Sequence, residues 1–396
     1  MKILVITPIY PTPNATNSPT KVVHFFAKEW VKRGNDVRVV HLPSYFISVL
    51  YKMPTFIERI VSKRFGSPVP KNIIKEKREL NIDGIPVLSI PQFKLLPGGK
   101  ISVSRIKHSC KAIIEFFEAC NFKPDVIASH WTEPSLPFVS ELKKHYNCPA
   151  TMVTHANSIK YYANLRGCID LWGYRCNRMV NEFNKLYPEI KFGFRCYSGV
   201  PNYFFKNIPT RDYSQANRYI YVGMMLERKY PDVVLEAVRN IHGDNIDYAL
   251  KLIGDGVLLD RLRTRVKDYG INKQVSLPGK INREALISEL DSSDIFIMVS
   301  SGEVFGLVYL EAMSRGCIII ASRNEGMEGI ISHGENGFLI EAGNQLELEN
   351  TIKYIQQLTT DERRKISENA FNTALELTDE KVAEMYLNEI QKLVHN

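Results

Sequence analysis

The sequence predicts an α/β protein with two doubly wound domains. Short apolar runs alternate with helix-like segments through most of the chain, which is the pattern of parallel sheets. The 396 residues exceed the roughly 150 of an average domain. Residues 1–200 carry 29 basic against 14 acidic side chains, a net charge of +15, whereas the remainder has a net charge of −7. This asymmetry indicates two domains with different partners.

The first domain is expected at 1–205. An apolar run opens the chain, a loop rich in Pro and Asn follows, and a helix pattern then stops at Gly34 before the next extended run. Strand, helix and strand in this order form the unit of a parallel sheet. The predicted strands and helices of this domain lie at 2–7, 22–33, 36–40, 124–130, 135–146 and 150–155.

A second alternation predicts another domain at 215–379, after a linker near 200–217 where Pro, Asn and Ser gather. Its expected strands lie at 218–223, 248–253, 274–277, 294–299 and 317–321. Its expected helices lie at 231–240, 257–269, 282–291, 306–315 and 325–332. A last helix at about 380–396 is expected to pack back on the first domain.

The composition argues against several classes of protein. No run approaches the ~20 apolar residues of a membrane span, and the apolar start of "MKILVITPIY" is too short for a secretory signal, so we expect a cytoplasmic protein. The seven cysteines are odd in number and none forms Cys-x-x-Cys, which argues against a disulfide framework or a zinc site.

A basic segment at 51–78 holds eight basic and two acidic residues among apolar ones. It is either a solvated surface or a face that meets anionic lipid headgroups on the inner side of a membrane. Nucleic acid is not expected as a partner, because no recognition motif accompanies the charge.

The stretch "SSGEVFGLVYLEA", residues 300–312, carries the most specific chemistry. It follows an apolar run and leads into a predicted helix, with Glu303 and Glu311 on either side of Gly306. Unpaired amides at a helix start bind phosphate, and carboxylates accept hydrogen bonds from sugar hydroxyls. Eight residues of helix span about 12 Å, roughly the reach from a hexose past a diphosphate to a ribose. The arrangement fits a nucleotide sugar; the alternative is one acid at a helix start and another on the surface.

Several polar residues and glycines fall at the ends of predicted strands: His130, His155, Gly223, Gly254 and Glu303. In doubly wound sheets, ligands bind at the carboxyl ends of the strands. With two such domains, the ligand is expected in the cleft between them. The coincidence supports a shared cleft better than any one of these residues does.

These residues carry a resemblance that covers nearly the whole chain. "EVFGLVYLE" followed by "AMSRGCIIIAS" resembles the donor motif of the retaining GT-B glycosyltransferases of the large family four, the group 1 glycosyl transferases. The stretches "VGMMLERKYPDVVLEAV", "LIGDG", "VSLPGKI" and "HGENGFLI" are similar, in order, to other parts of the family's donor domain. "VITPIYPTP", "KRGNDVRVV", "SHWTEPSLP" and "VTHANSI" are similar to segments of its acceptor domain. The resemblance implies the GT-B fold, two Rossmann-like domains that face each other across a cleft.

The resemblance also implies a role for each matching residue. Glu303 would contact the donor hexose and His155 would lie near the reacting sugar, so both are assigned to catalysis; a satisfied strand-end histidine is the alternative for His155. Lys229 would neutralise the diphosphate and Glu311 would bind the ribose. The implied donor-binding residues are Gly223, Arg228, Lys229, Gly254, Phe305, Gly306, Leu307 and Glu311. The weaker acceptor and loop candidates are Asn17, Ser18 and His130.

Three positions depart from the family pattern. Met224 follows Gly223 where the family usually has arginine, and Arg228 is the candidate substitute for that cation. The segment 17–20 replaces the usual glycine pair of the first loop, and Gly329 stands where many members have glutamate. These changes imply either altered donor geometry or lost activity.

The chain contains no Asp-x-Asp, so it has no obvious metal seat for a diphosphate. We therefore expect a metal-independent transferase without a cofactor, in which helix amides, Lys229 and Arg228 stabilise the leaving group. The resemblance implies retention of configuration by front-face attack, with the leaving phosphate helping to deprotonate the acceptor. The expected donor is a UDP-sugar, and the expected acceptor is a glycan or a polyprenyl-linked carrier in cell-surface polysaccharide synthesis.

Other functions fit parts of the pattern. A NAD-dependent oxidoreductase would need Gly-x-Gly-x-x-Gly after its first strand, but "PIYPTPNATNSP" stands there, and Leu259 replaces the third glycine after Gly254 and Gly256. An epimerase of the same architecture would bind a nucleotide sugar without an acceptor. A non-catalytic subunit that binds a nucleotide sugar or a glycan is the alternative from a different class, encouraged by Met224.

Overall fold

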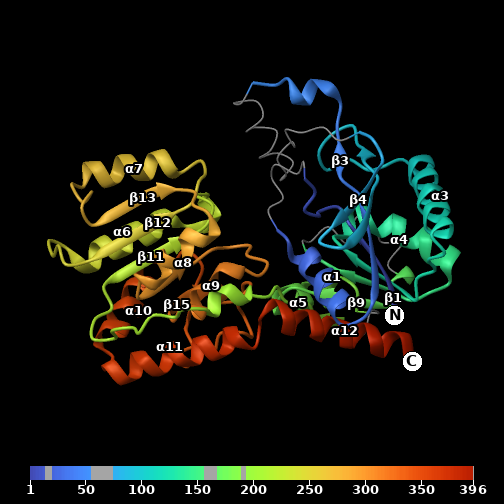
Figure 1. The fold of residues 1–396 in the computed structure, drawn as a ribbon. Helices are drawn as coiled ribbons and strands as arrows, with labels where there is room; N and C mark the ends of the chain where they lie inside the picture. Colours follow the sequence, from blue (N-terminus) through green and yellow to red (C-terminus); the bar gives the residue numbers. More distant parts are fainter. Residues whose placement is uncertain (14–19, 55–74, 156–166, 189–192, 396) are drawn as a thin grey trace. The chain divides into compact units, whose positions relative to one another are not determined.

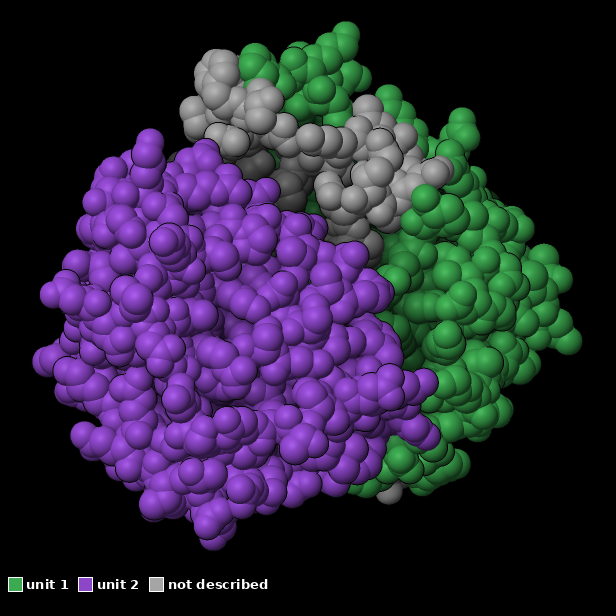
Figure 2. Space-filling model, turned by 60° about the vertical axis from the view of Figure 1, so that its left-hand side comes forward, with its two compact units in different colours: residues 1–174, 190–196, 382–396 green, residues 175–189, 197–381 purple. Residues whose placement is uncertain are grey.

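The computed structural model describes residues 1–13, 20–54, 75–155, 167–188 and 193–395. Contacts between residues divide the chain into two compact units (Figure 2). Unit 1 contains Met1–Tyr174, Ile190–Cys196 and Val382–Asn396, and unit 2 contains Arg175–Glu189 and Tyr197–Lys381. The segment 175–189 is thus counted with unit 2, although the sequence places it inside the first domain.

Unit 1 is built on an eight-stranded sheet with the order β10-β9-β8-β7-β1-β2-β5-β4. All neighbours pair in parallel except β4 and β5, which form an antiparallel hairpin at one edge. The strands are β1 (Lys2–Thr7), β2 (Asp36–His41), β4 (Arg78–Ile82), β5 (Ile85–Ser89), β7 (Val126–His130), β8 (Ala150–Val153), β9 (Leu171–Tyr174) and β10 (Gly193–Arg195). The central strand β1 is buried on both faces, as expected of a parallel sheet covered by helices.

Helices pack around this sheet, and a small two-stranded sheet lies beside it. The helical elements are α1 (Val22–Lys32), η1 (Ser48–Tyr51), α3 (Val103–Ala119), α4 (Thr132–Tyr146) and α12 (Asp379–His395). The small sheet pairs β3 (Ser44–Tyr45) with β6 (Gln92–Phe93). The start of α3 is set by Ser102, whose side chain accepts a hydrogen bond from the Arg105 amide.

The C-terminal helix α12 contributes side chains to the core of unit 1. Trp30 on α1 donates from its indole nitrogen to the Ala383 carbonyl at 2.9 Å. The Tyr386 hydroxyl lies 2.6 Å from Thr151 Oγ1 on β8, and its ring packs edge-on against Trp30 and Phe26. These contacts join the end of the chain to the domain in which it begins.

Unit 2 contains a six-stranded parallel sheet with the order β13-β12-β11-β14-β15-β16 (Figure 1). This is the order 3-2-1-4-5-6 of a doubly wound fold. The strands are β11 (Arg218–Val222), β12 (Ala249–Ile253), β13 (Val275–Gly279), β14 (Ile295–Met298), β15 (Ile318–Ser322) and β16 (Phe338–Ile340). The order reverses between β11 and β14, and the carboxyl ends of these strands form the switch point at which such folds bind ligands.

The helices of unit 2 connect these strands and extend beyond them. They are α5 (Asn177–Leu186), η3 (Asn202–Phe205), η4 (Glu227–Lys229), α6 (Pro231–His242), α7 (Leu259–Asp268), α8 (Arg283–Asp291), α9 (Leu307–Ser314), α10 (Gln345–Gln357) and α11 (Thr360–Leu375). α6 packs against α10, and α9 packs against α11. Within the described part of the chain, no helix is both long and apolar enough to cross a membrane.

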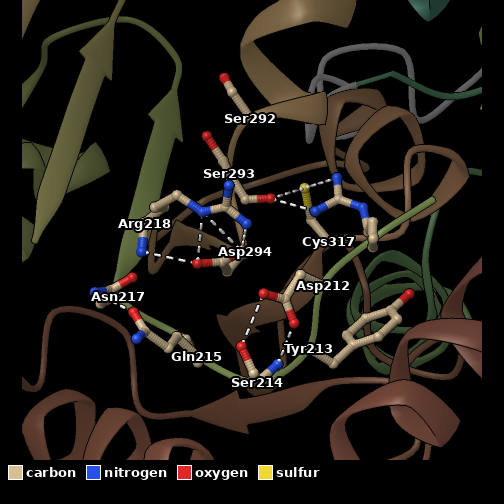
Figure 3. Close-up of polar contacts among 12 residues, drawn as sticks. Asp212, Tyr213, Ser214, Gln215, Asn217, Arg218, Ser292, Ser293, Asp294 and Cys317 are labelled. Carbon is tan, nitrogen blue, oxygen red and sulfur yellow. Dashed lines mark hydrogen bonds and ion pairs between the residues drawn. The ribbon is translucent and has the colours of Figure 1, made fainter. Parts of the chain in front are cut away.

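The linker expected near 200–217 is anchored to unit 2 along its length. Arg315, which is only 1 % exposed, donates to the Phe204 carbonyl at 2.8 Å. Where the linker enters β11, Arg218 pairs with Asp294, its Nε lying 3.0 Å from Oδ1 (Figure 3). The segment therefore belongs to the folded unit and is not a free tether.

The predicted fold class is confirmed, and most predicted strands and helices are present with small shifts at their ends. The helix predicted at 325–332 is wrong, because this segment forms turns with a bridge between Glu328 and Ile331. Gly326 and Gly329 account for the difference, since glycine weakens a helix and Gly329 adopts a φ of +83°. Helices α10 and α11 lie beyond the last helix predicted for this domain.

Candidate functional site

A buried ion pair lies at the switch point of unit 2. Lys229 ends η4, the short helix after β11, and Glu303 lies in the turn after β14. The Lys229 ammonium contacts the Glu303 carboxylate, and the two side chains are only 8 % and 14 % exposed. The Ser300 hydroxyl donates a further, longer hydrogen bond to Glu303 at 3.4 Å. The fold therefore brings together Lys229 and Glu303, the cation and the carboxylate that the sequence analysis assigned to the same donor molecule.

The turn that carries Glu303 is held from two sides. The Glu325 carboxylate accepts hydrogen bonds from the amides of Gly302 and Glu303 at 2.9 and 2.7 Å. Arg228 donates from Nη1 to the carbonyl oxygens of Ser301 and Gly302 at 3.2 and 3.4 Å. Arg228, proposed from the sequence as a substitute cation, thus lies beside Glu303, with its guanidinium bonded to the turn itself.

The start of α9 follows this turn and depends on Gly306. Gly306 adopts a left-handed conformation with φ +75°, and a Cβ added there would lie 2.5 Å from the Tyr309 ring. No side chain caps the helix, and its first turn contains no acidic residue. The amides of Leu307 and Val308 therefore lie at the positive end of the helix dipole, where an anion binds, whereas the Tyr309 amide already donates to the Gly306 carbonyl at 3.0 Å.

Phe305, the residue between the turn and the helix start, is buried at 4 % exposure. Its ring lies 5.0 Å from the guanidinium of Arg175 and 5.8 Å from the ring of Tyr197. Both partners come from segments of unit 2 that precede its sheet. The side chain of Phe305 thus fixes the backbone beside Gly306, and its predicted contact with a donor would be made by the backbone amide.

Gly223 and Gly254 directly follow the adjacent strands β11 and β12, and their backbones lie close together. A Cβ added to Gly254, whose φ is +146°, would lie 1.8 Å from the Gly223 carbonyl oxygen. The Gly254 amide also donates to the Gly279 carbonyl at 3.0 Å. Close packing of the strand ends thus requires glycine at 254 whether or not a ligand is bound, and the donor-binding role of the two glycines stays a prediction.

Glu311, the second carboxylate of the motif, has a different partner. It lies on α9 at 4 % exposure, and Arg283 Nε donates to its Oε1 at 2.7 Å. A second nitrogen of Arg283 contacts the same oxygen. Burial raises the pKa of Glu311, and the guanidinium of Arg283 opposes that shift. Glu303 and Glu311 are therefore two separately neutralised carboxylates.

The two histidines of the prediction belong to unit 1 and lie together at the ends of β7 and β8. His130 is fully buried, and its Nδ1 lies 3.2 Å from His155 Nε2. The ring of Trp131 stacks on His155 with centroids 3.8 Å apart and an angle of 12° between the planes. The imidazole of His155 is thus held in a fixed orientation. Asn17 and Ser18 lie outside the described residues, as does most of the basic segment 51–78.

The sequence reasoning missed residues that reach the site from distant elements. Glu325 accepts a hydrogen bond from the Glu303 amide, and Arg283 donates to the Glu311 carboxylate. Arg178 on α5 donates to the Glu303 carbonyl at 3.4 Å. A Cβ added at Gly329 would lie 2.2 Å from Asn177 Nδ2, so an α5 side chain fills the place beside this glycine. For the contact with α5, the only signal in the sequence is Gly329 itself, at a position where many members of the family have glutamate.

Comparison with known proteins identifies the second unit. A family model described as "Glycosyl transferases group 1" matches residues 207–373. Over these residues, the chain is similar to the glycosyl transferases group 1 family. The match includes Lys229, Glu303 and Glu311, and with them the whole of α9.

Two curated relatives named as glycosyltransferases match part of the chain. The lipopolysaccharide core biosynthesis glycosyltransferase LpsE of Rhizobium meliloti (strain 1021) is 29% identical over 169 residues, which are 42% of this chain and 47% of the relative. The putative colanic acid biosynthesis glycosyltransferase WcaL of Escherichia coli (strain K12) is 24% identical over 207 residues, 51% of this chain and 49% of the relative. The matched part thus spans about half the length of each relative.

Solved structures match over nearly the whole chain. A glycosyltransferase from Rickettsia africae ESF-5 has a TM-score of 0.72 at 17% identity, covering 100% of this chain and 99% of that one. Anabaena HepE in complex with UDP and glucose has a TM-score of 0.67 at 17% identity, covering 99% and 100%. At such identities the likeness concerns the fold, and it confirms the GT-B fold of two Rossmann-like domains.

Proposed function

We propose that the protein is a glycosyltransferase that moves a hexose from a nucleoside diphosphate sugar to a glycan or lipid-linked acceptor. The observation that carries the proposal is the buried Lys229–Glu303 pair at the start of α9 and at the switch point of the sheet. A cation from η4 meets there a carboxylate from the turn after β14, and the uncapped helix start of α9 follows a few residues later. A sugar diphosphate offers the complementary groups, an anionic diphosphate beside neutral hydroxyls.

The Lys229–Glu303 pair is suited to a donor molecule that gives each of the two residues a new partner in place of the other. The diphosphate would take over Lys229, and the amides at the beginning of α9 would share its charge. The carboxylate of Glu303 would then accept hydrogen bonds from the hexose and stabilise the positive charge that develops on the sugar ring in the transition state. Glu311, farther along α9, would bind the ribose, and His155 would lie near the reacting sugar.

The donor and acceptor classes are proposed from the relatives and from charge. HepE is described in complex with UDP and glucose, and LpsE and WcaL are named for lipopolysaccharide core and colanic acid biosynthesis. A UDP-sugar and an acceptor of surface polysaccharide synthesis are consistent with these names. The basic first half of the chain favours an acceptor that is anionic or carried on an anionic membrane.

Thermal shift with UDP-, GDP- and ADP-sugars tests the binding part of the proposal, because a ligand raises apparent stability by mass action. We expect one nucleotide class, UDP, to raise the midpoint in proportion to the logarithm of its concentration. Release of the nucleoside diphosphate with a glycan or polyprenyl-phosphate acceptor then tests transfer. A protein whose midpoint responds to none of these donors contradicts the proposal.

Two finer features of the reaction have their own tests. We propose that the reaction retains the anomeric configuration and needs no divalent metal, since Lys229, Arg228 and the helix amides supply the positive charge. Proton NMR of the product measures the configuration at the anomeric carbon.

Turnover with EDTA should match turnover without it. Loss of activity that magnesium or manganese restores would contradict metal independence.

A non-catalytic subunit that binds nucleotide sugars is the second candidate. It is favoured by Met224, which is 55 % exposed at the position where the family usually carries an arginine. A subunit of this kind would respond to the donor in thermal shift but release no nucleoside diphosphate with any acceptor. Turnover above the rate of the Lys229→Met variant excludes it.

A further inference from the structure

Arg283 holds the buried carboxylate of Glu311 with two nitrogens on one oxygen. Nε lies 2.7 Å from Oε1, and Nη2 contacts the same atom. Glu311 is 4 % exposed, so the fold removes this carboxylate from water. Among the described residues, Arg283 is the one side chain that bonds it. A buried carboxylate needs such a partner to stay ionised, since burial alone favours its neutral form.

Arg283 is itself fixed at both ends. It is the first residue of α8, whose start is set by the Asn282 side chain accepting from the Ala285 amide at 2.7 Å. At its other end the guanidinium carbon lies 5.8 Å from the centre of the Phe204 ring, which is fully buried. The Phe204 carbonyl is in turn bonded by Arg315. The Arg283 side chain is 34 % exposed, but its guanidinium is bonded to Glu311 on one side and packed near Phe204 on the other.

We infer that Arg283 is a positioning residue that orients Glu311 for the ribose, so that nucleotide binding depends on the ribose hydroxyls. With Oε1 occupied by Arg283, Oε2 is the oxygen left to accept from a ligand. An ionised carboxylate oxygen in a fixed position accepts one or both hydroxyls of a ribose, and hydrogen bonds to charged groups are the strong ones. This inference rests on the proposed function, which supplies the nucleotide.

Calorimetric titration with UDP and with its 2′,3′-dideoxy analogue tests the inference. The wild-type protein should bind the ribonucleotide about 10- to 150-fold more tightly than the analogue, the range expected for hydrogen bonds to a charged group. In Arg283→Gln that preference should fall to within about threefold, mainly through weaker binding of the ribonucleotide. A purely structural role for Arg283 would weaken the binding of both ligands equally, and that result would overturn the inference.

A double-mutant cycle with Glu311→Ala separates positioning from an independent contact. If Arg283 acts through Glu311, the double variant should bind UDP as Glu311→Ala alone does. Additive losses would mean that Arg283 contacts the nucleotide by itself and would contradict the positioning role. Arg283→Lys should retain part of the ribose preference, because one ammonium replaces a two-nitrogen contact.

Arg263→Gln on α7 is the matched control, since Arg263 is half-exposed and, within the described part of the chain, its guanidinium bonds the Leu277 carbonyl and Asp260 but not Glu311. This variant should keep the wild-type preference. Circular dichroism and urea midpoints identify any variant that has lost its fold. A wild-type protein that binds no nucleoside diphosphate contradicts the proposed function itself, whereas an unchanged ribose preference in Arg283→Gln contradicts only the role of Arg283.

Discussion

At the scale of single residues, internal ion pairs hold the side chains of the proposed donor site. Lys229 and Glu303 neutralise each other while both are largely buried, which avoids the high free energy of an isolated charge in the interior. A donor that engages both residues replaces this contact with two others. Removal of Lys229 should therefore lower the affinity for a nucleoside diphosphate, whereas removal of the Glu303 charge should raise it.

Lys229→Met should weaken binding of UDP by about 10- to 150-fold, because it removes a charge-assisted contact to the diphosphate. Isothermal titration measures the effect. Lys251→Met is the matched control, since Lys251 also lies in unit 2 and pairs with a carboxylate, Glu289, but does so on β12. The control should bind UDP as the wild type does, and equal losses in both variants would contradict the assignment of Lys229.

Removal of Lys229 leaves Glu303 buried without its cation, so instability could imitate a loss of binding. The double variant Lys229→Met/Glu303→Gln removes both charges and should recover most of the stability while binding UDP weakly. Glu303→Gln alone should bind UDP more tightly than wild type, because Lys229 no longer has an internal carboxylate that competes with the diphosphate. Weaker binding in Glu303→Gln would show that the pair does not compete with the diphosphate.

At the scale of secondary-structure elements, the connection from β14 through the turn to α9 is the central feature. Glu325 fixes its first part through two amides, and Gly306 sets the direction in which α9 leaves. The left-handed conformation of Gly306 is what allows the helix to start immediately after a buried phenylalanine. The element thus presents helix amides and a carboxylate on adjacent residues.

Gly306→Ala should lower the free energy of unfolding of unit 2 by more than Gly334→Ala does. Both glycines have left-handed φ angles, +75° and +81°, so each variant carries a backbone cost of about 1–2 kcal/mol. Only at Gly306 does the added Cβ meet a neighbour, the Tyr309 ring at 2.5 Å; at Gly334 nothing lies within 4 Å. Urea denaturation of the two variants measures the difference.

The two glycine variants should also differ in their affinity for UDP. Gly306→Ala should lose affinity for UDP, because α9 cannot keep its position when Tyr309 moves. Gly334→Ala should retain it. Equal stability of the two variants, or unchanged UDP affinity in Gly306→Ala, would contradict the importance of this helix start.

The sequence could predict those parts of the site that local patterns encode. Strand ends, the helix start at 307 and the carboxylates of the motif follow from hydrophobic periodicity and glycine placement within a few residues. The partners of these groups could not be predicted in this way. Arg283 is 28 residues from Glu311, Glu325 is 22 from Glu303, and Arg178 is 125 from Glu303. Such pairings arise only when distant elements pack.

The helix predicted at 325–332 failed for a related reason. Its apolar residues fit a helical period, but Gly326 lies against the backbone of Phe305, where an added Cβ would be 2.7 Å from the nearest atoms. Close approach of the two loops requires turns there and not a helix. A contact between strand ends thus overrode the local pattern.

At the scale of the whole molecule, charge divides the two halves of the chain. The basic first half and the acidic second half predict that the protein associates with anionic membranes through unit 1. The protein should co-sediment with vesicles containing anionic lipid at low salt and be released as salt screens the attraction. Equal sedimentation with neutral vesicles, or none with either, would contradict this prediction.

The central claim is that one donor molecule uses Glu303 at its sugar and Glu311 at its ribose, and steady-state kinetics of Glu303→Gln and Glu311→Ala test it most directly. Glu311→Ala should raise the Michaelis constant for the donor about 10- to 150-fold with little change in turnover, because the ribose is held alike in the ground and transition states. Glu303→Gln should mainly lower turnover, since the carboxylate acts where positive charge develops. Turnover of Glu303→Gln within about twofold of wild type, or identical failure of both variants, would contradict the account.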